Sequence, residues 1–279
     1  LVVGGGPAGM KAAAVAARRG HAVTLVERRE RLGGHLLLLE CLPAMSEWSV
    51  AIDNLEREVE NAGVEVRLAT EADVDMLRTE NASAVVIATG ASYEKTGLSL
   101  YRPDREGIPG ADLDHVFDVG TAAARALDDP ESLGKRVLIF DETGAHLPFA
   151  LAEILAKAGV DVEIMSPRMF AGERIYRNLD MLYIFPRLKQ LGVKITHQHF
   201  VEAIRAGEVD VYDIWAGAEA VEKRTGVESV VLSILRVPND DLYFEAQGLF
   251  PEVSRIGDVA APRDVAAVLV DGETLGRAL

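Results

Sequence analysis

The loop Gly4-Gly5-Gly6-Pro7-Ala8-Gly9 has three spaced glycines in the pattern of a dinucleotide-binding loop. Apolar residues 1–3 precede it and read as the end of a buried strand. An alanine-rich segment, 10–19, follows it and favours helix. Residues 21–27 then alternate and carry β-branched side chains, as a second strand does. The first 27 residues therefore predict one β-α-β unit.

Each glycine of this loop has its own physical reason. Gly4 permits the sharp turn from strand to helix, and Gly9 lets the helix pack closely on the strand. Gly6 has no Cβ, so a pyrophosphate can approach the backbone amides there. Pro7 suits the first helical position, and with Ala8 it opens a helix whose unpaired N–H groups and positive dipole end favour phosphate.

An acidic residue completes the pattern at the end of the second strand. Glu27 lies eighteen residues after Gly9, where a carboxylate can accept hydrogen bonds from an adenosine ribose hydroxyl. We expect Glu27 and its neighbour Arg28 to contact the cofactor. Strand, loop, helix and acid together favour an adenine-nucleotide site over a purely structural glycine turn.

Three shorter motifs are candidates for the same site. Gly34 and His35 follow the second strand, where paired glycines let the backbone pass close to a flat ligand or its phosphates, or simply form a turn. His35 is a candidate contact of a flavin ring or a polar loop residue. Thr89-Gly90 ends a short apolar strand, 84–88. Gly257-Asp258 precedes a helix from about residue 264, and Asp258 is placed to accept a ribityl hydroxyl.

A second β-α-β pattern begins near residue 135, after a segment, 93–118, that is rich in Pro, Gly and Asp and reads as a linker or excursion loop. Its strands and helix are predicted over 136–140, 147–158 and 160–165. Its loop, Asp141-Glu142-Thr143-Gly144-Ala145-His146, has one glycine and two carboxylates, which repel a pyrophosphate. The sequence therefore disfavours NAD(P)H in this second unit.

Composition excludes several classes of function. A net charge of −15 argues against nucleic acid as a partner, and no apolar run approaches the roughly 20 residues of a membrane span. Cys41 is the single cysteine, which excludes a disulfide or an iron–sulfur cluster from this segment alone and fits a reducing, cytoplasmic setting. His197 and His199 lack an obvious partner ligand, so we expect no metal site. The chain opens directly on the end of a strand, from which we expect that an N-terminal part is missing.

These motifs, in this order, resemble a known family. The chain is similar to the C-terminal two-domain half of the trimethylamine dehydrogenase and 2,4-dienoyl-CoA reductase group of the old yellow enzyme (NADH:flavin oxidoreductase) family. The resemblance rests on the glycine loop with Glu27, Gly33-Gly34-His35-Leu36, Leu42-Pro43 with Glu47-Trp48, Ala88-Thr89-Gly90, Val211-Tyr212-Asp213-Ile214-Trp215, and Gly257-Asp258 with Ala261-Pro262-Arg263. One departure is Leu232-Ser233-Ile234-Leu235-Arg236, where the family usually has Thr-Gly-Arg and only Arg236 survives.

The resemblance implies an α/β fold of two Rossmann-like domains with doubly wound parallel sheets, the second inserted in the first. We expect the FAD/ADP-binding domain over 1–125 and 229–279, and the NAD(P)-binding-like domain over 133–228. By resemblance, the first holds FAD in the reductase branch or ADP in the amine dehydrogenase branch, and the second holds NAD(P)H or nothing. FMN and a 4Fe-4S cluster are expected only in an N-terminal (β/α)8 barrel outside this sequence.

The resulting hypothesis is the nucleotide-binding portion of a flavin-dependent oxidoreductase of the amine dehydrogenase or enoate reductase type. Its expected partners are the barrel domain, an electron-transfer protein and further copies of itself as a homo-oligomer. Two alternatives stay open. One is a stand-alone NAD(P)H-dependent flavoprotein reductase, and the other is a non-catalytic nucleotide-binding scaffold for assembly. No catalytic residue can be identified within the chain.

Overall fold

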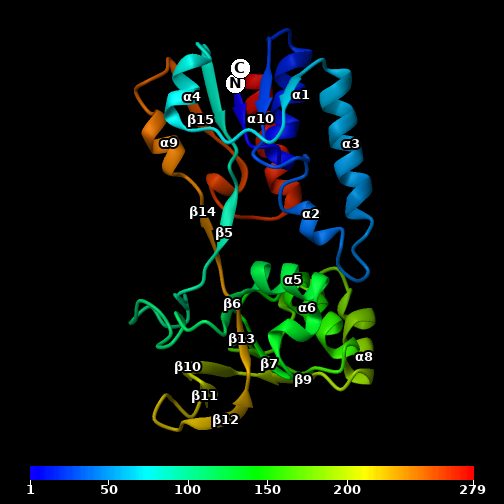
Figure 1. Ribbon diagram of the computed structural model, residues 1–279, viewed down its shortest axis with the longest axis vertical. Coiled ribbons are helices and arrows are strands. Elements are labelled where there is room, and N and C mark those ends of the chain that lie inside the picture. The colour runs from blue at the N-terminus through cyan, green and yellow to red at the C-terminus, as the bar shows by residue number, and fades with distance from the viewer. The chain divides into compact units, whose positions relative to one another are not determined.

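The computed structural model describes all residues, 1–279, and the chain forms two compact units (Figure 1). The first unit contains residues 1–40, 45–92 and 236–279, and the second contains 41–44 and 93–235. Along the chain, the second unit is therefore inserted between two parts of the first. Each unit is built around its own five-stranded parallel sheet, which confirms the predicted α/β class.

The sheet of the first unit has the strand order β15-β4-β1-β2-β3, and every neighbouring pair is parallel. Its strands are β1 (Val2–Val3), β2 (Thr24–Val26), β3 (Glu65–Arg67), β4 (Ala84–Ile87) and β15 (Glu252–Arg255). The predicted β-α-β unit is confirmed as β1, α1 and β2. Because β1 is the central strand, the glycine loop that follows it starts in the middle of the edge formed by the carboxyl ends of the strands.

Helices cover both faces of this sheet. They are α1 (Pro7–Arg18), α2 (Leu36–Leu39), α3 (Trp48–Asn61), α4 (Val74–Thr79), α9 (Asp241–Ala246), the 3-10 helix η2 (Gly257–Val259) and α10 (Val265–Ala278). Successive strand residues point to opposite faces, so Val2 packs in the cluster with α1, α3 and α10, whereas Val3 packs in the cluster with α4 and α9.

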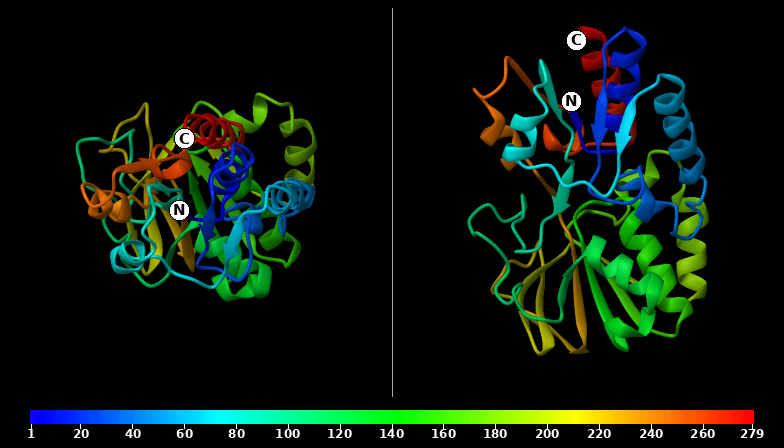
Figure 2. Two further views of the ribbon diagram at one scale, coloured as in Figure 1. Left: turned by 90° about the horizontal axis from the view of Figure 1, so that it is seen from above. Right: turned by 45° about the horizontal axis from the view of Figure 1, so that its top comes forward.

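Small residues bring α1 and α10 close together, and the two helices run side by side (Figure 2). A Cβ placed on Gly272 would lie 2.5 Å from the Ala8 carbonyl oxygen, and one on Gly276 would lie 2.7 Å from the Val15 Cβ. Only glycine fits at either position without moving a helix. The first turn of α1, where the glycine loop ends, is thus fixed from behind by α10.

The second unit has the parallel strand order β6-β13-β7-β8-β9. Its strands are β6 (Val116–Asp118), β7 (Arg136–Asp141), β8 (Asp161–Ser166), β9 (Lys194–His197) and β13 (Ser229–Ser233). Its helices are α5 (Val119–Asp128), the 3-10 helix η1 (Pro130–Leu133), α6 (His146–Lys157), α7 (Glu173–Tyr176) and α8 (Met181–Gln190). Helices α5, α6 and α8 pack together, and α5 and α6 pack on the strands of this sheet.

The other face of this sheet is covered by strands, where a doubly wound fold has helices. An antiparallel sheet of β10 (His199–Arg205), β11 (Gly207–Asp213) and β12 (Glu222–Val227) lies there. Its core joins that of the parallel sheet, with the Phe140 and Phe200 rings in an edge contact 5.0 Å between centroids. The sequence did not predict this layer.

The unit boundaries differ from the expected 125 and 229. Residues from 93 onward belong to the second unit, because β6 pairs with β13 and the preceding loop packs on β10. In that loop Arg105 donates to the Val201 carbonyl at 2.8 Å and Arg102 donates to the Tyr212 hydroxyl at 2.8 Å. Strands β5 (Ala91–Tyr93) and β14 (Arg236–Pro238) pair where the chain leaves and re-enters the first unit. No helix combines the length and the apolar character needed to cross a membrane.

Candidate functional site

The glycine loop after β1 is packed tightly at two of its three spaced glycines. Gly4 has φ +108°, and a Cβ there would lie 2.3 Å from the Ala88 carbonyl oxygen. A Cβ on Gly9 would lie 1.9 Å from the Gly4 oxygen. Both positions require glycine for the turn and for the packing of α1 on β1, whatever the loop binds.

Gly6 is different, because nothing in the chain requires a glycine there. Its backbone is extended, with φ −76° and ψ 178°, which any residue adopts. A Cβ on Gly6 would meet only the Gly34 Cα, at 3.9 Å. The space in front of Gly6 is open, and α1 begins immediately after it with Pro7 at its first position.

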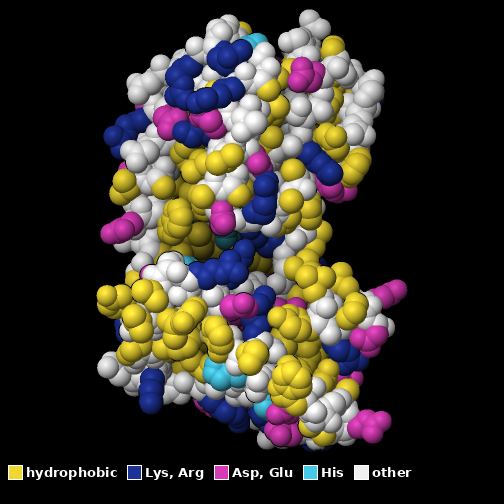
Figure 3. All heavy atoms as spheres, turned by 180° about the vertical axis from the view of Figure 1, so that it is seen from behind, with side chains coloured by type: hydrophobic (Ala, Val, Ile, Leu, Met, Phe, Trp, Pro, Cys, Tyr) yellow, Lys and Arg dark blue, Asp and Glu magenta, His cyan; other side chains and the backbone are white.

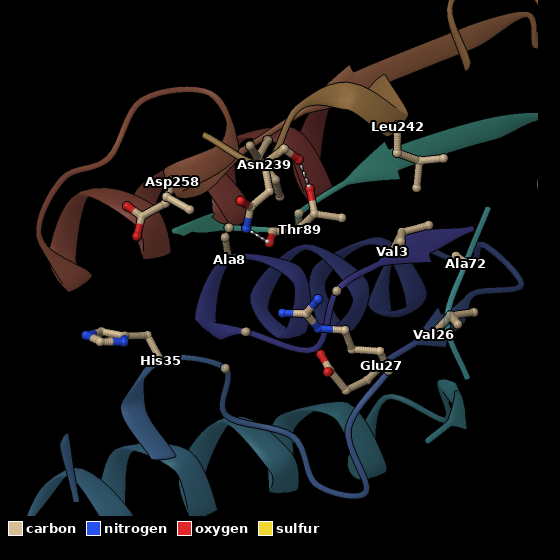
Figure 4. A pocket seen from close by; sticks show the side chains of 18 of the residues that line it. Val3, Ala8, Val26, Glu27, His35, Ala72, Thr89, Asn239, Leu242 and Asp258 are labelled. Atoms are coloured by element: carbon tan, nitrogen blue, oxygen red, sulfur yellow. Dashed lines mark hydrogen bonds between the residues drawn. The ribbon is translucent and has the colours of Figure 1, made fainter. Parts of the chain in front are cut away.

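This open space is part of a cavity of about 450 Å³ in the first unit (Figure 4). Eleven of the predicted site residues line it: Gly4, Gly6, Pro7, Ala8, Glu27, Arg28, Gly34, His35, Thr89, Gly90 and Asp258. Gly9 and Gly257 do not line it. A Cβ on Gly257 would lie 2.7 Å from the Ala8 Cβ, so Gly257 packs behind the loop. The structure thus gathers residues that are up to about 250 positions apart in the sequence around one loop.

Glu27 lies at the end of β2 and is almost completely buried, with 6% of its surface exposed. Its Oε2 accepts a hydrogen bond from the Gly5 amide at 2.6 Å, and its Oε1 accepts one from the Arg29 amide at 2.9 Å. The carboxylate therefore holds the glycine loop in place and also faces the cavity. Each of its oxygens has a further lone pair, so these bonds leave room for a ribose hydroxyl.

Gly34 packs directly against the glycine loop, and His35 follows it in the cavity wall. A Cβ on Gly34 would lie 2.9 Å from the Gly6 Cα, which explains why glycine stands there. The Arg29 guanidinium donates to the Gly34 carbonyl at 2.8 Å. Burial, together with the charges of Arg236 and Arg29, lowers the pKa of His35 to about 4. At neutral pH the imidazole is uncharged, so it offers hydrogen bonding without adding a positive charge to the cavity.

Asn239 was not found from the sequence, although it holds the Thr-Gly turn. The Thr89 hydroxyl donates to the Asn239 carbonyl at 2.7 Å, and the Asn239 amide donates to the Thr89 carbonyl at 3.2 Å (Figure 4). The two residues are 150 positions apart. Pro238 before it is typical of a turn, but no local pattern identifies a contact between residues so far apart in the sequence.

The Asp258 carboxylate is paired with an arginine. Arg236, the residue that survives from the family's Thr-Gly-Arg pattern, forms an ion pair with Asp258. The Arg263 amide donates to Asp258 at 2.9 Å, and Arg236 also donates to the Arg263 carbonyl at 2.6 Å. The expected acceptor of a ribityl hydroxyl is therefore already bonded within the chain.

In the second unit, the loop that corresponds to the glycine loop is hydrogen-bonded to one of its own side chains, Asp141. Asp141 is fully buried, rather than lying at the mouth of the loop as the sequence suggested. Its carboxylate accepts hydrogen bonds from the Thr143 amide at 2.9 Å and the Gly144 amide at 3.1 Å, and from the Thr143 and Ser233 hydroxyls. Burial raises its pKa, while these hydrogen bonds act in the opposite direction. Loop amides that would hold a phosphate are thus bonded to a carboxylate of the same chain.

The segment after β8 closes this second loop further. The Arg174 amide donates to the Gly144 carbonyl at 3.0 Å, and the Arg168 guanidinium donates to the Glu142 carbonyl at 2.7 Å. A Cβ on Gly144 would lie 2.9 Å from the Glu173 amide nitrogen. Gly144 therefore has no open space in front of it comparable to that of Gly6. No three His, Cys, Asp or Glu side chains in the structure lie together as a metal site would require.

The two units define a class of protein. A parallel sheet carries a glycine loop at its centre and an acid at the end of the next strand, and a second parallel-sheet unit is inserted into the first. This is the dinucleotide-binding architecture of flavoprotein oxidoreductases. The sequence profile of the pyridine nucleotide-disulphide oxidoreductases matches residues 1–260. The chain belongs to this oxidoreductase family.

Individual relatives are more specific. Dimethylamine dehydrogenase of Hyphomicrobium sp. (strain x) is 30% identical over 309 aligned positions, covering 99% of this chain and 41% of that protein. A probable N-methylproline demethylase of Rhizobium meliloti (strain 1021) is 32% identical, covering 95% of this chain and 37% of that protein. The structure of histamine dehydrogenase from Rhizobium sp. 4-9 matches with a TM-score of 0.91 and 28% identity, covering 100% of this chain and 43% of that one.

These relatives confirm the resemblance to the trimethylamine dehydrogenase group. The chain spans about two fifths of their length. It corresponds to the nucleotide-binding portion of such flavoprotein oxidoreductases.

Proposed function

We propose that the first unit binds the adenosine diphosphate moiety of FAD, or ADP in its place, within a flavin-dependent oxidoreductase of the amine dehydrogenase or enoate reductase type. One observation carries this proposal. Neither the backbone conformation nor the packing of the chain requires glycine at position 6, which stands at the start of a helix and faces an open cavity. A ligand that must approach the backbone closely would explain why glycine is present there.

Different residues around the cavity contact different parts of the ligand. The amides of the loop and of the first turn of α1 face the pyrophosphate, where the helix dipole favours negative charge. Glu27 accepts from the adenosine ribose, and Arg28, Gly34, His35, Thr89 and Gly90 line the remaining wall. FAD, when bound, supplies hydride and single-electron transfer, whereas ADP supplies neither. The Arg236–Asp258 ion pair favours ADP, because a ribityl chain would compete with it for the Asp258 carboxylate.

The second unit, in this proposal, does not take NAD(P)H. Its loop amides are bonded to the Asp141 carboxylate, so a pyrophosphate would have to displace a buried acceptor of the same charge. This argues against a stand-alone NAD(P)H-dependent reductase. A scaffold role for the bound nucleotide remains compatible with the same site when ADP is the ligand.

The complete protein is proposed from its relatives. Because they are more than twice as long as this chain, we infer an additional N-terminal barrel with FMN and a 4Fe-4S cluster. We propose a cytoplasmic homo-oligomer that passes electrons to an electron-transfer protein. Amine and enoate substrates would both be bound outside the residues described here.

The substitution Gly6→Ala tests the nucleotide site. A Cβ there has room in the chain but would stand where the pyrophosphate approaches, so the thermal midpoint should stay within about 2 °C while ADP affinity falls at least about tenfold, or about 1.4 kcal/mol. Isothermal titration of the nucleotide-stripped protein with ADP, FAD and NADH measures the affinities. Val270→Ala, at an exposed position of α10 outside the cavity, is the control and should leave them unchanged. Equal ADP affinity in Gly6→Ala and the native chain would refute the assignment.

A further inference from the structure

Helix α8 has apolar side chains on its buried face and also on the outer side of its first turn, whereas Arg187, Lys189 and Gln190 stand in its last turn. Ile184, Phe185 and Leu188 turn toward the second unit and are buried or half-buried. Leu182 and Tyr183 face the other way and are 60% and 72% exposed. A surface helix normally has one apolar stripe toward the core and polar residues on the opposite face, and Leu182 and Tyr183 depart from that pattern. The outer side of the first turn of α8 is thus more apolar than a solvent-facing helix surface usually is.

The exposed apolar surface extends into the segment before α8. Met169 is 74% exposed, and Phe170 and Tyr176 lie in an edge contact with 5.5 Å between ring centroids, both exposed. Leu179 links this segment to α8, because the Leu179 amide bonds to the Tyr176 carbonyl and the Leu182 amide to the Leu179 carbonyl. Hydrophobic side chains are gathered on the surface of the second unit in Figure 3. We call these six residues the α8 face: Met169, Phe170, Tyr176, Leu179, Leu182 and Tyr183.

The charge around the α8 face is opposite to that of the chain. Residues 168–189 contain five Lys or Arg against two acidic residues, in a chain of net charge −15. Arg168 pairs with Glu173 and Arg187 with Glu153. Arg174, Arg177 and Lys189 are exposed and take part in none of the ion pairs of the structure. Three exposed cations without ionic partners therefore lie in the same segment of the chain as the α8 face.

We propose that the α8 face is the docking surface for an acidic partner protein, whose carboxylates meet Arg174, Arg177 and Lys189 around an apolar contact. An apolar centre with a charged rim is the usual anatomy of a protein interface, and rim charges set the choice of partner. A second copy of this chain is a poorer occupant. A two-fold contact would place the same three cations opposite one another. This inference does not depend on the nucleotide proposed for the first unit.

A pair of labelled helical peptides tests the docking surface. One has leucine on one face and glutamate on the other, and its twin has lysine in place of every glutamate. Fluorescence anisotropy with the full chain should show the acidic peptide binding at least about tenfold more tightly than the basic one, with the preference shrinking as salt is raised. Leu182→Glu with Tyr183→Glu, and separately Arg174→Ala with Arg177→Ala, should each weaken the acidic peptide at least about fivefold. Val270→Glu, at an equally exposed apolar position of α10, should not.

The variants alter exposed side chains, so their thermal midpoints and circular dichroism should match those of the native chain. The arginine pair keeps the test valid should the glutamate pair disturb α8. Equal binding of the two peptides, or binding that neither variant pair weakens, would overturn the proposal. So would sedimentation that shows Leu182→Glu dissolving a native oligomer, or tighter binding to phosphatidylserine vesicles than to the acidic peptide. In those cases the face belongs to a second copy or to a membrane surface.

Discussion

Two adjacent carboxyl groups in the second unit show how much a residue's role depends on its surroundings. Asp141 accepts hydrogen bonds from two loop amides and two hydroxyls. Glu142 is 5% exposed and accepts one side-chain hydrogen bond, from the Ser99 hydroxyl at 2.5 Å. Burial raises the pKa of Glu142 to about 7, the Arg168 charge and the Ser99 bond oppose this, and Asp141 and Glu94 reinforce it. Near neutral pH, Glu142 is therefore a group whose protonation is linked to folding.

The sign of that linkage gives a pH prediction. Between the ordinary Glu pKa of 4.5 and about 7, the unfolded chain loses this proton and the folded chain keeps it. The free energy of unfolding should therefore fall as pH rises through this window. Glu142→Gln resembles the protonated carboxyl, so from pH 4.5 to pH 8 the native chain should lose on the order of 3 kcal/mol more stability than the variant. Urea unfolding at both pH values measures this. Asp141 is common to both chains, and parallel pH profiles would contradict the prediction.

Among single residues, the sequence predicted those whose place in the site depends only on neighbouring sequence. Gly4, Gly6 and Glu27 follow from a loop, a helix start and a strand end within 27 consecutive residues. Asn239 and the pairing of Arg236 with Asp258 could not be predicted, because these contacts depend on how distant segments meet. The burial of Asp141 was missed for a related reason, since a carboxylate beside a loop reads as solvated until its hydrogen-bond partners are known.

Among elements, the central strands and long helices were predictable because hydrophobic periodicity and glycine stops are local signals. The short strands β5, β6 and β14 and the pairing of β10–β12 into an antiparallel layer were not, because a strand alone does not specify which face of another sheet it covers. The crossing of α1 and α10 is another feature of this kind. Glycine is normally unfavourable inside a helix, but Gly272 and Gly276 form the surface of α10 that contacts α1.

That crossing links packing to the nucleotide site. In Gly272→Ala the new Cβ would lie 2.5 Å from the Ala8 carbonyl oxygen, so α1 or α10 must shift. Because Ala8 lines the cavity, the shift should weaken ADP binding severalfold while overpacking costs about 1 to 3 kcal/mol of stability. Calorimetric titration and urea unfolding measure the two effects. Val270→Ala on the exposed side of the same helix is the control, and a stable variant with native ADP affinity would show that the crossing does not position the loop.

For the whole molecule, the insertion of one unit into another was expected from the family resemblance, whereas the boundaries at 92 and 236 were not predicted. The reason is that β6 and β13 are short strands whose partners lie in the second sheet. Each unit has its own hydrophobic core. A ligand held by one unit therefore stabilises that unit first, by an amount set by its affinity and concentration.

The two tryptophans allow this to be measured, because Trp48 lies in the first unit and Trp215 in the second. In a Trp215→Phe chain, the fluorescence of Trp48 follows the unfolding of the first unit alone. ADP at a hundred times its dissociation constant should raise the free energy of that transition by about 2.7 kcal/mol, and the same concentration of NADH should leave it unchanged. At the same ADP concentration, adding Gly6→Ala should lower the ADP effect to about 1.4 kcal/mol or less without moving the ligand-free transition. A comparable shift with NADH would mean that a nicotinamide dinucleotide occupies the first unit, and the division of roles between the two loops would then have to be abandoned.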